Sequence, residues 1–235
     1  MLAVVAVAAV LAGLGGLLVP AMVRRLPEPD TQPREGEPPK PLYAELADRP
    51  GLAARSACWS AAVGAVVGAA VGWDWWLVVL VPLVPVGVCL AYVDWHTRLL
   101  PTRIVLPATG LVLVAAVVGL VGGDVDGLVR TVAGLLAARS FYWLLWRVNG
   151  AGMGFGDVRL AALLGGALGH VGWGELVAGM YAGFLVFGLP GLVLAVVRRD
   201  RAMLKKAFPF GPSMLVGALL GLVVGSAVWG HLAGG

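Results

Sequence analysis

Long apolar runs, separated by short polar segments, recur along the whole chain. Eight of these runs predict helices, in order Leu2–Val23, Ala53–Gly72, Trp75–Val93, Ile104–Val121, Leu128–Trp146, Val158–Val171, Leu176–Val197 and Gly211–Trp229. A helix needs roughly 20 apolar residues to cross the hydrocarbon core. The sixth run is short and either begins below the membrane surface or is re-entrant. Because a lipid-embedded backbone must satisfy its own amides, the pattern predicts an all-α polytopic membrane bundle of about eight transmembrane helices.

The composition supports a membrane protein without a separate soluble domain. Hydrophobic residues make up 60% of the 235 positions and charged residues only 13%, whereas soluble domains carry about 25% charged residues. We therefore treat residues 1–235 as one membrane domain. Within it, residues 24–52 form a proline-rich, acidic segment that predicts a partly disordered cytoplasmic loop. A solvated linker is the simplest interpretation, and attraction of a basic ligand is the alternative.

The distribution of charge predicts orientation rather than a nucleic-acid partner. The formal net charge is +4, but the cations lie between apolar runs and form no basic stripe. With both termini outside, nearly all of the 17 lysines and arginines fall in inner loops, as the positive-inside rule requires. The two cysteines, Cys58 and Cys89, form no CxxC pair. We therefore expect no metal site and no cofactor.

Two carboxylates stand at the inner ends of predicted helices. Asp94 follows the third run in AYVDWHTRLLP, and Asp157 opens the sixth in GMGFGDVRLA. Acids at membrane depth are costly and usually face a bundle interior or a water-filled cavity. Two adjacent carboxylates share a proton, so one can act as a base towards water while the other acts as an acid.

Each aspartate also has a simpler interpretation. Asp94 can pair with His96 or Arg98 at the membrane interface, and Asp157 can stabilise the start of a helix through the helix dipole. The glycines before Asp157, at positions 152, 154 and 156, allow the backbone to bend and to approach a second chain closely. Gly154 and Gly156 are therefore candidate substrate-binding residues.

The motifs resemble those of the type IV prepilin peptidases, which are polytopic aspartic proteases. Asp94 and Pro101 match the pattern D-x6-P around the first aspartate, and Gly154, Gly156, Asp157, Arg159 and Leu160 match GxGDxK/R-L around the second. The late PFGP stretch from Pro209 to Pro212 and the Arg25-Leu26-Pro27 sequence also resemble family segments. Thr102 stands where the family more often has Asn or Asp, and Arg159 where it has Lys.

This resemblance implies an activity, a location and a partner. It implies hydrolysis of the leader of a prepilin or pseudopilin precursor at the cytoplasmic face of the inner (plasma) membrane, with Asp94 and Asp157 as catalytic residues. Many bacterial members carry a cytoplasmic loop with two zinc-binding CxxC pairs that are associated with N-methyltransferase activity. The loop between Arg24 and Arg55 contains no cysteine, which speaks against that activity here.

Two rival functions fit parts of the sequence. Presenilin-like intramembrane proteases share the GxGD motif, but they usually have YD at the first aspartate and PAL near the end, where this chain has Val93-Asp94 and PFGP. A proton-coupled transporter would use the two acids as a proton relay. The sequence offers no clear inverted repeat for that second function.

Overall fold

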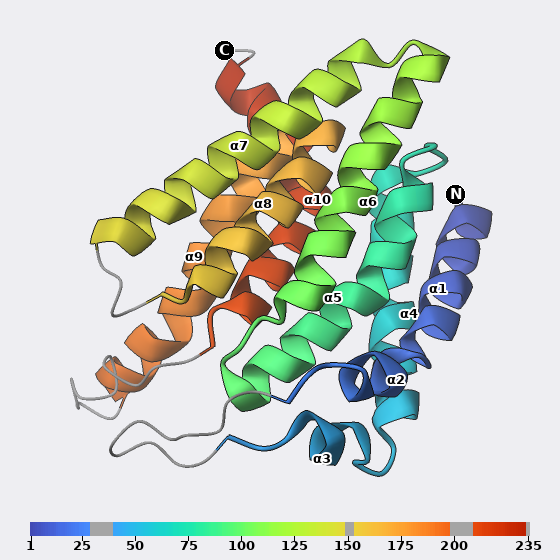
Figure 1. The fold of residues 1–235 in the computed structure, drawn as a ribbon. Coiled ribbons are helices and arrows are strands. Elements are labelled where there is room, and N and C mark those ends of the chain that lie inside the picture. The colour runs from blue at the N-terminus through green and yellow to red at the C-terminus, as the bar shows by residue number, and fades with distance from the viewer. Residues whose placement is uncertain (29–39, 149–152, 198–208, 234–235) are drawn as a thin grey trace. The chain divides into compact units, whose positions relative to one another are not determined.

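The computed structural model describes residues 1–28, 40–148, 153–197 and 209–233, and every regular element within these ranges is helical (Figure 1). The elements are α1 (Leu2–Gly16), α2 (Val19–Arg24), α3 (Tyr43–Ala47), α4 (Leu52–Val71), α5 (Leu77–Thr97), α6 (Thr102–Gly119), the 3-10 turn η1 (Leu120–Gly122), α7 (Val125–Val148), α8 (Phe155–Val171), α9 (Trp173–Val197) and α10 (Gly211–Ala233). The prediction of an all-α polytopic membrane bundle is confirmed.

Six stretches in the described ranges are long and apolar enough to cross a membrane. They are Leu2–Arg24, Leu52–Val71, Leu77–Thr97, Thr102–Gly122, Val125–Val148 and Gly211–His231. The remaining two predicted runs correspond to α8, which has 17 residues, and to α9, whose apolar stretch covers Trp173–Leu189. All eight apolar runs therefore form helices. With 17 residues α8 is shorter than a full span, whereas α9 has 25 residues, Trp173–Val197.

The chain divides into two compact units, Met1–Ile104 and Val105–Gly235. The first holds α1 to α5 and the second holds most of α6 together with α7 to α10. The assignment of residues 1–235 to one membrane domain stays a prediction.

In the first unit, α1 and α4 pack together through small residues. A Cβ added to Gly64 would lie 2.6 Å from the Ala8 carbonyl oxygen, and one added to Gly16 would lie 2.6 Å from the Ser56 carbonyl oxygen. Only glycine allows the two backbones this close. Small residues at helix contacts are typical of membrane proteins, where van der Waals packing largely replaces the hydrophobic effect.

The predicted first span is one candidate crossing, Leu2–Arg24, and its helix is interrupted between α1 and α2. The amides of Leu17 and Leu18 bond to the carbonyls three residues earlier, Leu14 and Gly15, at 3.2 and 3.0 Å. Pro20, in the first turn of α2, has no amide hydrogen to continue the helical ladder. The chain therefore tightens at Leu17–Leu18 and restarts as α2.

The described end of the proline-rich loop is packed rather than solvated, which corrects the expectation of a linker. Residues 29–39 lie outside the described ranges, but residues 40–52 include α3. A buried cluster joins α3 to α2 and to the end of α5 and contains Val19, Val23, Leu26, Tyr43, Leu46, Ala47, Cys89 and Val93. The loop therefore supplies a structural element to the first unit.

In the second unit, α8 is the most enclosed of the helices with described side chains, because α7, α9 and α10 all contact it. A Cβ on Gly165 would lie 2.5 Å from the Ala138 Cβ and 2.6 Å from the Gly134 carbonyl oxygen, both on α7. The small residues of these two helices thus bring their backbones close together. At 17 residues, α8 is about 25 Å long, somewhat less than the hydrocarbon core.

Candidate active site

Asp94 lies inside the last turn of α5 rather than after the helix, which corrects the sequence-based boundary. The helix continues to Thr97, and the Asp94 side chain is only 4% exposed. The helix closes at Arg98, whose backbone adopts the left-handed conformation (φ 54°) and whose amide donates to the Asp94 carbonyl at 2.8 Å. This end geometry is common at helix C-termini, although glycine usually occupies the position. The turn that carries the carboxylate is thus well defined.

His96 does not serve as the partner of Asp94 that the simpler interpretation proposed. Its Nε2 lies 2.7 Å from Arg49 Nη1, and its Nδ1 lies 2.8 Å from the Tyr92 carbonyl oxygen. A guanidinium can only donate, so Nε2 accepts and Nδ1 carries the hydrogen that the carbonyl receives. Both ring nitrogens are therefore engaged away from the carboxylate.

Asp157 is the third residue of α8, which begins at Phe155 and thus earlier than the predicted Val158. Its Oδ2 accepts a hydrogen bond from the Gly154 amide at 2.9 Å, and its own amide donates to the Gly154 carbonyl at 3.1 Å. The side chain is 7% exposed. The carboxylate thus satisfies an amide that a helix start leaves unpaired, at the end of the helix dipole that favours negative charge.

Tyr142 is a neighbour of Asp157 that sequence reasoning missed. It lies on α7, is 2% exposed, and interacts electrostatically with the Asp157 carboxylate. Its ring stacks on Phe184 of α9 with centroids 5.4 Å apart, and both rings contact Phe210. Phe210 belongs to the PFGP stretch, so this late motif helps to enclose the side of the unit that carries Asp157.

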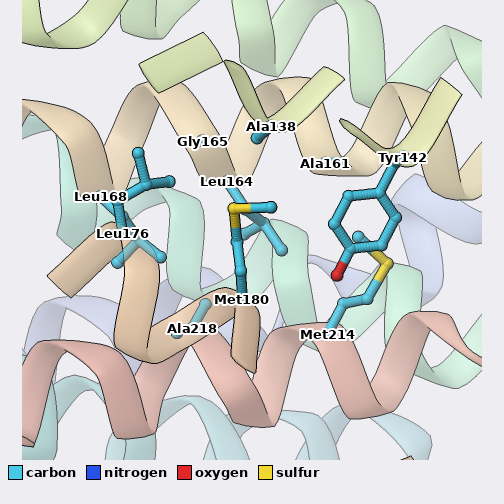
Figure 2. A pocket seen from close by; sticks show the side chains of 11 residues that line it. Ala138, Tyr142, Ala161, Leu164, Gly165, Leu168, Leu176, Met180, Met214 and Ala218 are labelled. Atoms are coloured by element: carbon cyan, nitrogen blue, oxygen red, sulfur yellow. The ribbon is translucent and has the colours of Figure 1, made fainter. Parts of the chain in front are cut away.

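A small apolar cavity lies beside Tyr142. Figure 2 shows the tyrosine ring projecting into it next to Met214, while Leu168 and Leu176 line the opposite end. Its volume is about 20 Å³, enough for roughly one water molecule and far too small for a peptide. The cavity therefore marks loose packing beside Tyr142 and is not a substrate site.

Neither glycine before Asp157 has a backbone conformation that only glycine allows. Gly154 has φ −78° and ψ 151°, and a Cβ there would meet Asp157 Oδ2 at 3.6 Å, an ordinary contact. Gly156 lies within the first turn of α8. Gly152 lies outside the described residues. The substrate-binding role of Gly154 and Gly156 stays a prediction.

Arg159 of the second motif packs on an aromatic ring. Its guanidinium carbon lies 4.9 Å from the centre of the Phe155 ring, which also meets Trp146 of α7 edge to face at 5.1 Å. A cation over an aromatic face is attracted by the ring quadrupole. This contact ties the first turn of α8 to the end of α7 next to Asp157.

Two acids in the described part of the loop make contacts within the protein. Glu28 accepts hydrogen bonds from the Tyr43 and Ala44 amides at 2.7 and 2.9 Å, and Asp48 forms an ion pair with Arg24. Intramolecular contacts thus account for two of the acids that suggested a basic ligand. Across the ranges that the structure covers, no three His, Cys, Asp or Glu side chains gather in a way that fits a metal ion.

Asp94 and Asp157 belong to different units, so their pairing stays a prediction. Each is buried, each lies within one turn of a helix end, and each is positioned by backbone bonds of that turn. A buried carboxylate at a helix end is suited to proton transfer when a second acid and a water molecule come within hydrogen-bond reach.

Comparison with known proteins adds independent information about these residues. Residues 81–196, which include both aspartates, match the family model described as the type IV leader peptidase family. The chain is 34% identical over 152 residues to the prepilin leader peptidase/N-methyltransferase of Pseudomonas putida, covering 64% of this chain and 51% of that protein. It is 31% identical over 163 residues to the protein of the same name from Neisseria gonorrhoeae, covering 67% of this chain and 52% of that protein.

The chain spans about half the length of these curated relatives. No solved structure matches it. The resemblance that the two aspartate motifs indicated is confirmed.

Proposed function

Because residues 81–196 belong to the type IV leader peptidase family, we propose that this protein is a membrane aspartic endopeptidase. It removes the leader peptide from type IV prepilin-like or pseudopilin precursors. The observation that carries the proposal is the pair of buried aspartates, Asp94 and Asp157, at helix ends within the segment that matches the family.

The chemistry needs the two carboxylates to act together. When two carboxylates lie close, one proton is shared between them, because both cannot remain ionised. The ionised member takes a proton from water as the water attacks the peptide carbonyl, and the protonated member donates to the developing tetrahedral centre. This route needs neither a metal ion nor a covalent intermediate.

The order of the helices supports a shared location for the two acids. Between the end of α5 and the start of α8 the chain forms α6 and α7, both parts of candidate spans. Two crossings return the chain to the side from which it left. The positive-inside rule assigns that side to the cytoplasm of the inner membrane, where the leader of a precursor would be reached before export.

The substrate would approach α8 along the glycines that precede Asp157. An extended chain needs a surface without side chains in order to come close to a backbone, and Gly154 leaves such a surface. Hydrogen bonding along an extended peptide would then present its scissile bond to the aspartates. The lipid bilayer holds the hydrophobic segment that follows the cleavage site in such precursors.

We do not extend the proposal to methyl transfer. The relatives carry both activities in their name, but the internal loop at residues 24–52 has none of the cysteines that the resemblance associates with methylation. The presenilin-like alternative is not favoured, because the family match and the relatives described above are all leader peptidases.

The proposal is tested by leader removal from a tagged pilin-like precursor that is co-expressed with the full chain. Wild type, Asp94→Asn and Asp157→Asn are compared at equal membrane levels. Each substitution is expected to reduce cleavage by at least about 100-fold, the usual contribution of a general acid or base. Asp126→Asn is the matched control, because Asp126 is an exposed acid in the first turn of α7.

Cleavage that persists in both aspartate variants would overturn the protease function. Proton-coupled transport would then be the next function to test. Loss of cleavage in Asp126→Asn as well would show that the assay responds to general damage rather than to the two acids.

A further inference from the structure

We infer that the segment from Leu42 to Arg49, which contains α3, is a positioning element that holds the Asp94 turn of α5. This inference rests on the proposed peptidase function, because it assigns to the loop a role in cleavage. We call residues 42–49 the α3 segment. The described contacts tie it to α5 at three residues that lie within one turn of Asp94: Tyr92, His96 and Thr97.

The first contact joins two hydroxyl groups. Tyr43 is 4% exposed, and its side chain is hydrogen-bonded to that of Thr97, which is 1% exposed. Thr97 Oγ1 already donates its only hydrogen to the Val93 carbonyl at 2.8 Å. Tyr43 must therefore be the donor and Thr97 the acceptor.

Donation by Tyr43 requires only that its phenol is protonated, and the net shift of its pKa satisfies this requirement. Burial raises the pKa of the Tyr43 phenol above its usual value, the hydrogen bond with Thr97 lowers it, and Glu28 raises it again. The net direction is upwards, so the phenol keeps its hydrogen at neutral pH. The Tyr43 hydroxyl therefore has a hydrogen to donate to Thr97 at neutral pH.

The second and third contacts are at Tyr92 and His96, two residues before and two residues after Asp94 in α5. The Tyr92 hydroxyl donates to the Leu46 carbonyl at 3.0 Å, and Arg49 donates to His96 Nε2 at 2.7 Å. His96 is in turn fixed within α5, because its Nδ1 donates to the Tyr92 carbonyl. Side chains of both the α3 segment and α5 therefore form bonds between the two elements.

Packing makes these bonds rigid. Leu46 is fully buried and belongs to the same cluster as Val93, the residue before Asp94. Glu28 fixes the start of α3 by accepting from the Tyr43 and Ala44 amides. A five-residue helix would not be stable alone. Its order comes from docking on both α2 and the end of α5, and in return it restrains the turn that carries the carboxylate.

Catalysis depends on this restraint if two acids must share one proton, because a displacement of about 1 Å can cost about 100-fold in rate. The α3 segment touches neither water nor substrate in this scheme. Tyr43 and Thr97 are therefore positioning residues. Their removal should lower kcat and leave KM nearly unchanged, because the substrate contacts remain.

The test uses the purified full chain with a purified precursor and measures kcat and KM separately. Tyr43→Phe and Thr97→Val each remove one hydroxyl while the ring or the branched shape stays. Each is expected to lower kcat by about threefold to tenfold, with KM within about twofold. Thr97→Ser, which keeps the acceptor oxygen, should restore most of the rate.

Matched controls separate positioning from general damage. Thr109→Val removes a hydroxyl that makes the same bond within its helix, to the Val105 carbonyl at 2.9 Å. Tyr181→Phe removes a hydroxyl from a tyrosine that is 65% exposed. Both controls should keep the wild-type kcat. The double variant Tyr43→Phe/Thr97→Val should be no slower than the slower single variant, since both hydroxyls form one bond.

Tyr92→Phe provides a second test, because it removes a different bond to the same segment. If Tyr43→Phe, Thr97→Val and Tyr92→Phe all cleave at the wild-type rate while Asp94→Asn does not cleave, the positioning role is overturned and the peptidase function stands. If wild type and Asp94→Asn cleave equally, the peptidase function fails and the positioning role fails with it.

Discussion

Asp94 and Asp157 sit at opposite kinds of helix end and are held in different ways. Asp94 lies in the last turn of α5, where the restraints come from side chains of a separate segment. Asp157 lies in the first turn of α8, where the Gly154 amide holds its carboxylate directly. One aspartate is thus positioned by tertiary contacts and the other mainly by its own helix start.

The helices that carry the two aspartates also differ in how they pack against their neighbours. The end of α5 is backed by a cluster of larger side chains that includes Leu46 and Val93. Farther along the helix that carries Asp157, from Gly165 onwards, α7 and α8 approach through glycines, so the two backbones almost touch. We infer that backbone contact with α7 suffices to hold α8, whereas the end of α5 is held by the α3 segment.

The largest effect is expected from Leu46→Ala. Leu46 is fully buried. Truncation of a buried leucine side chain costs about 2–5 kcal/mol of stability. The α3 segment should undock and cleavage should fall more than with any single hydroxyl removal. Leu42→Ala, at a position that is 37% exposed in the same segment, is the control and should leave cleavage unchanged. Equal loss in both variants would contradict the account.

The second prediction tests the α7 and α8 contact with a single methyl group. Gly165→Ala places a Cβ 2.5 Å from that of Ala138, so it should destabilise the protein by about 1–3 kcal/mol. Gly110→Ala adds the same group where no atom lies within 4 Å and should not destabilise it. The midpoint of thermal unfolding of the solubilised protein measures the stability of both variants. A Gly165→Ala midpoint equal to that of wild type would show that the backbones are farther apart.

The third prediction concerns the glycine before Asp157. Gly154→Ala introduces only an ordinary contact with Asp157 Oδ2, so stability should change by less than about 0.5 kcal/mol. We expect KM for the precursor to rise, because the new methyl group occupies the proposed path of the substrate. An unchanged KM would remove Gly154 from the substrate-binding residues.

The smallest effect is expected from Arg49→Lys. The lysine keeps the charge and can still donate to His96 Nε2, but it loses the planar geometry of the guanidinium. Cleavage should fall by less than about threefold, because Tyr43 and Tyr92 still hold the α3 segment. A loss as large as that of Leu46→Ala would mean that Arg49 acts on the reaction more directly.

Much of the fold was predictable because apolar runs report helices in a membrane protein. The errors fall at helix ends. The third run stops at Val93, but α5 continues through Trp95 and His96 to Thr97, since a helix can extend beyond the lipid with polar residues. The break before Pro20 was missed because the apolar pattern passes through it without interruption.

The surroundings of the site were less predictable than its acids. Asp94 and Asp157 were recognisable because charged residues are rare in apolar runs and because each lies in a motif. The α3 segment was not recognisable, because its helix has only five residues, Tyr43–Ala47, which are too few to show a helical pattern in the sequence. Tyr142 was missed because its position beside Asp157 depends on the packing of α7 against α8 and not on any local signal.

The most direct test of the central claim, that Asp94 and Asp157 meet, is chemical cross-linking in the membrane. Cysteines replace both aspartates in a chain that also carries Cys58→Ala and Cys89→Ala, and a short bifunctional thiol reagent is applied. Mass spectrometry should find a peptide link between positions 94 and 157, and none when the second cysteine is at position 126 instead. Absence of the 94–157 link, although both thiols react with a monofunctional reagent, would contradict the account.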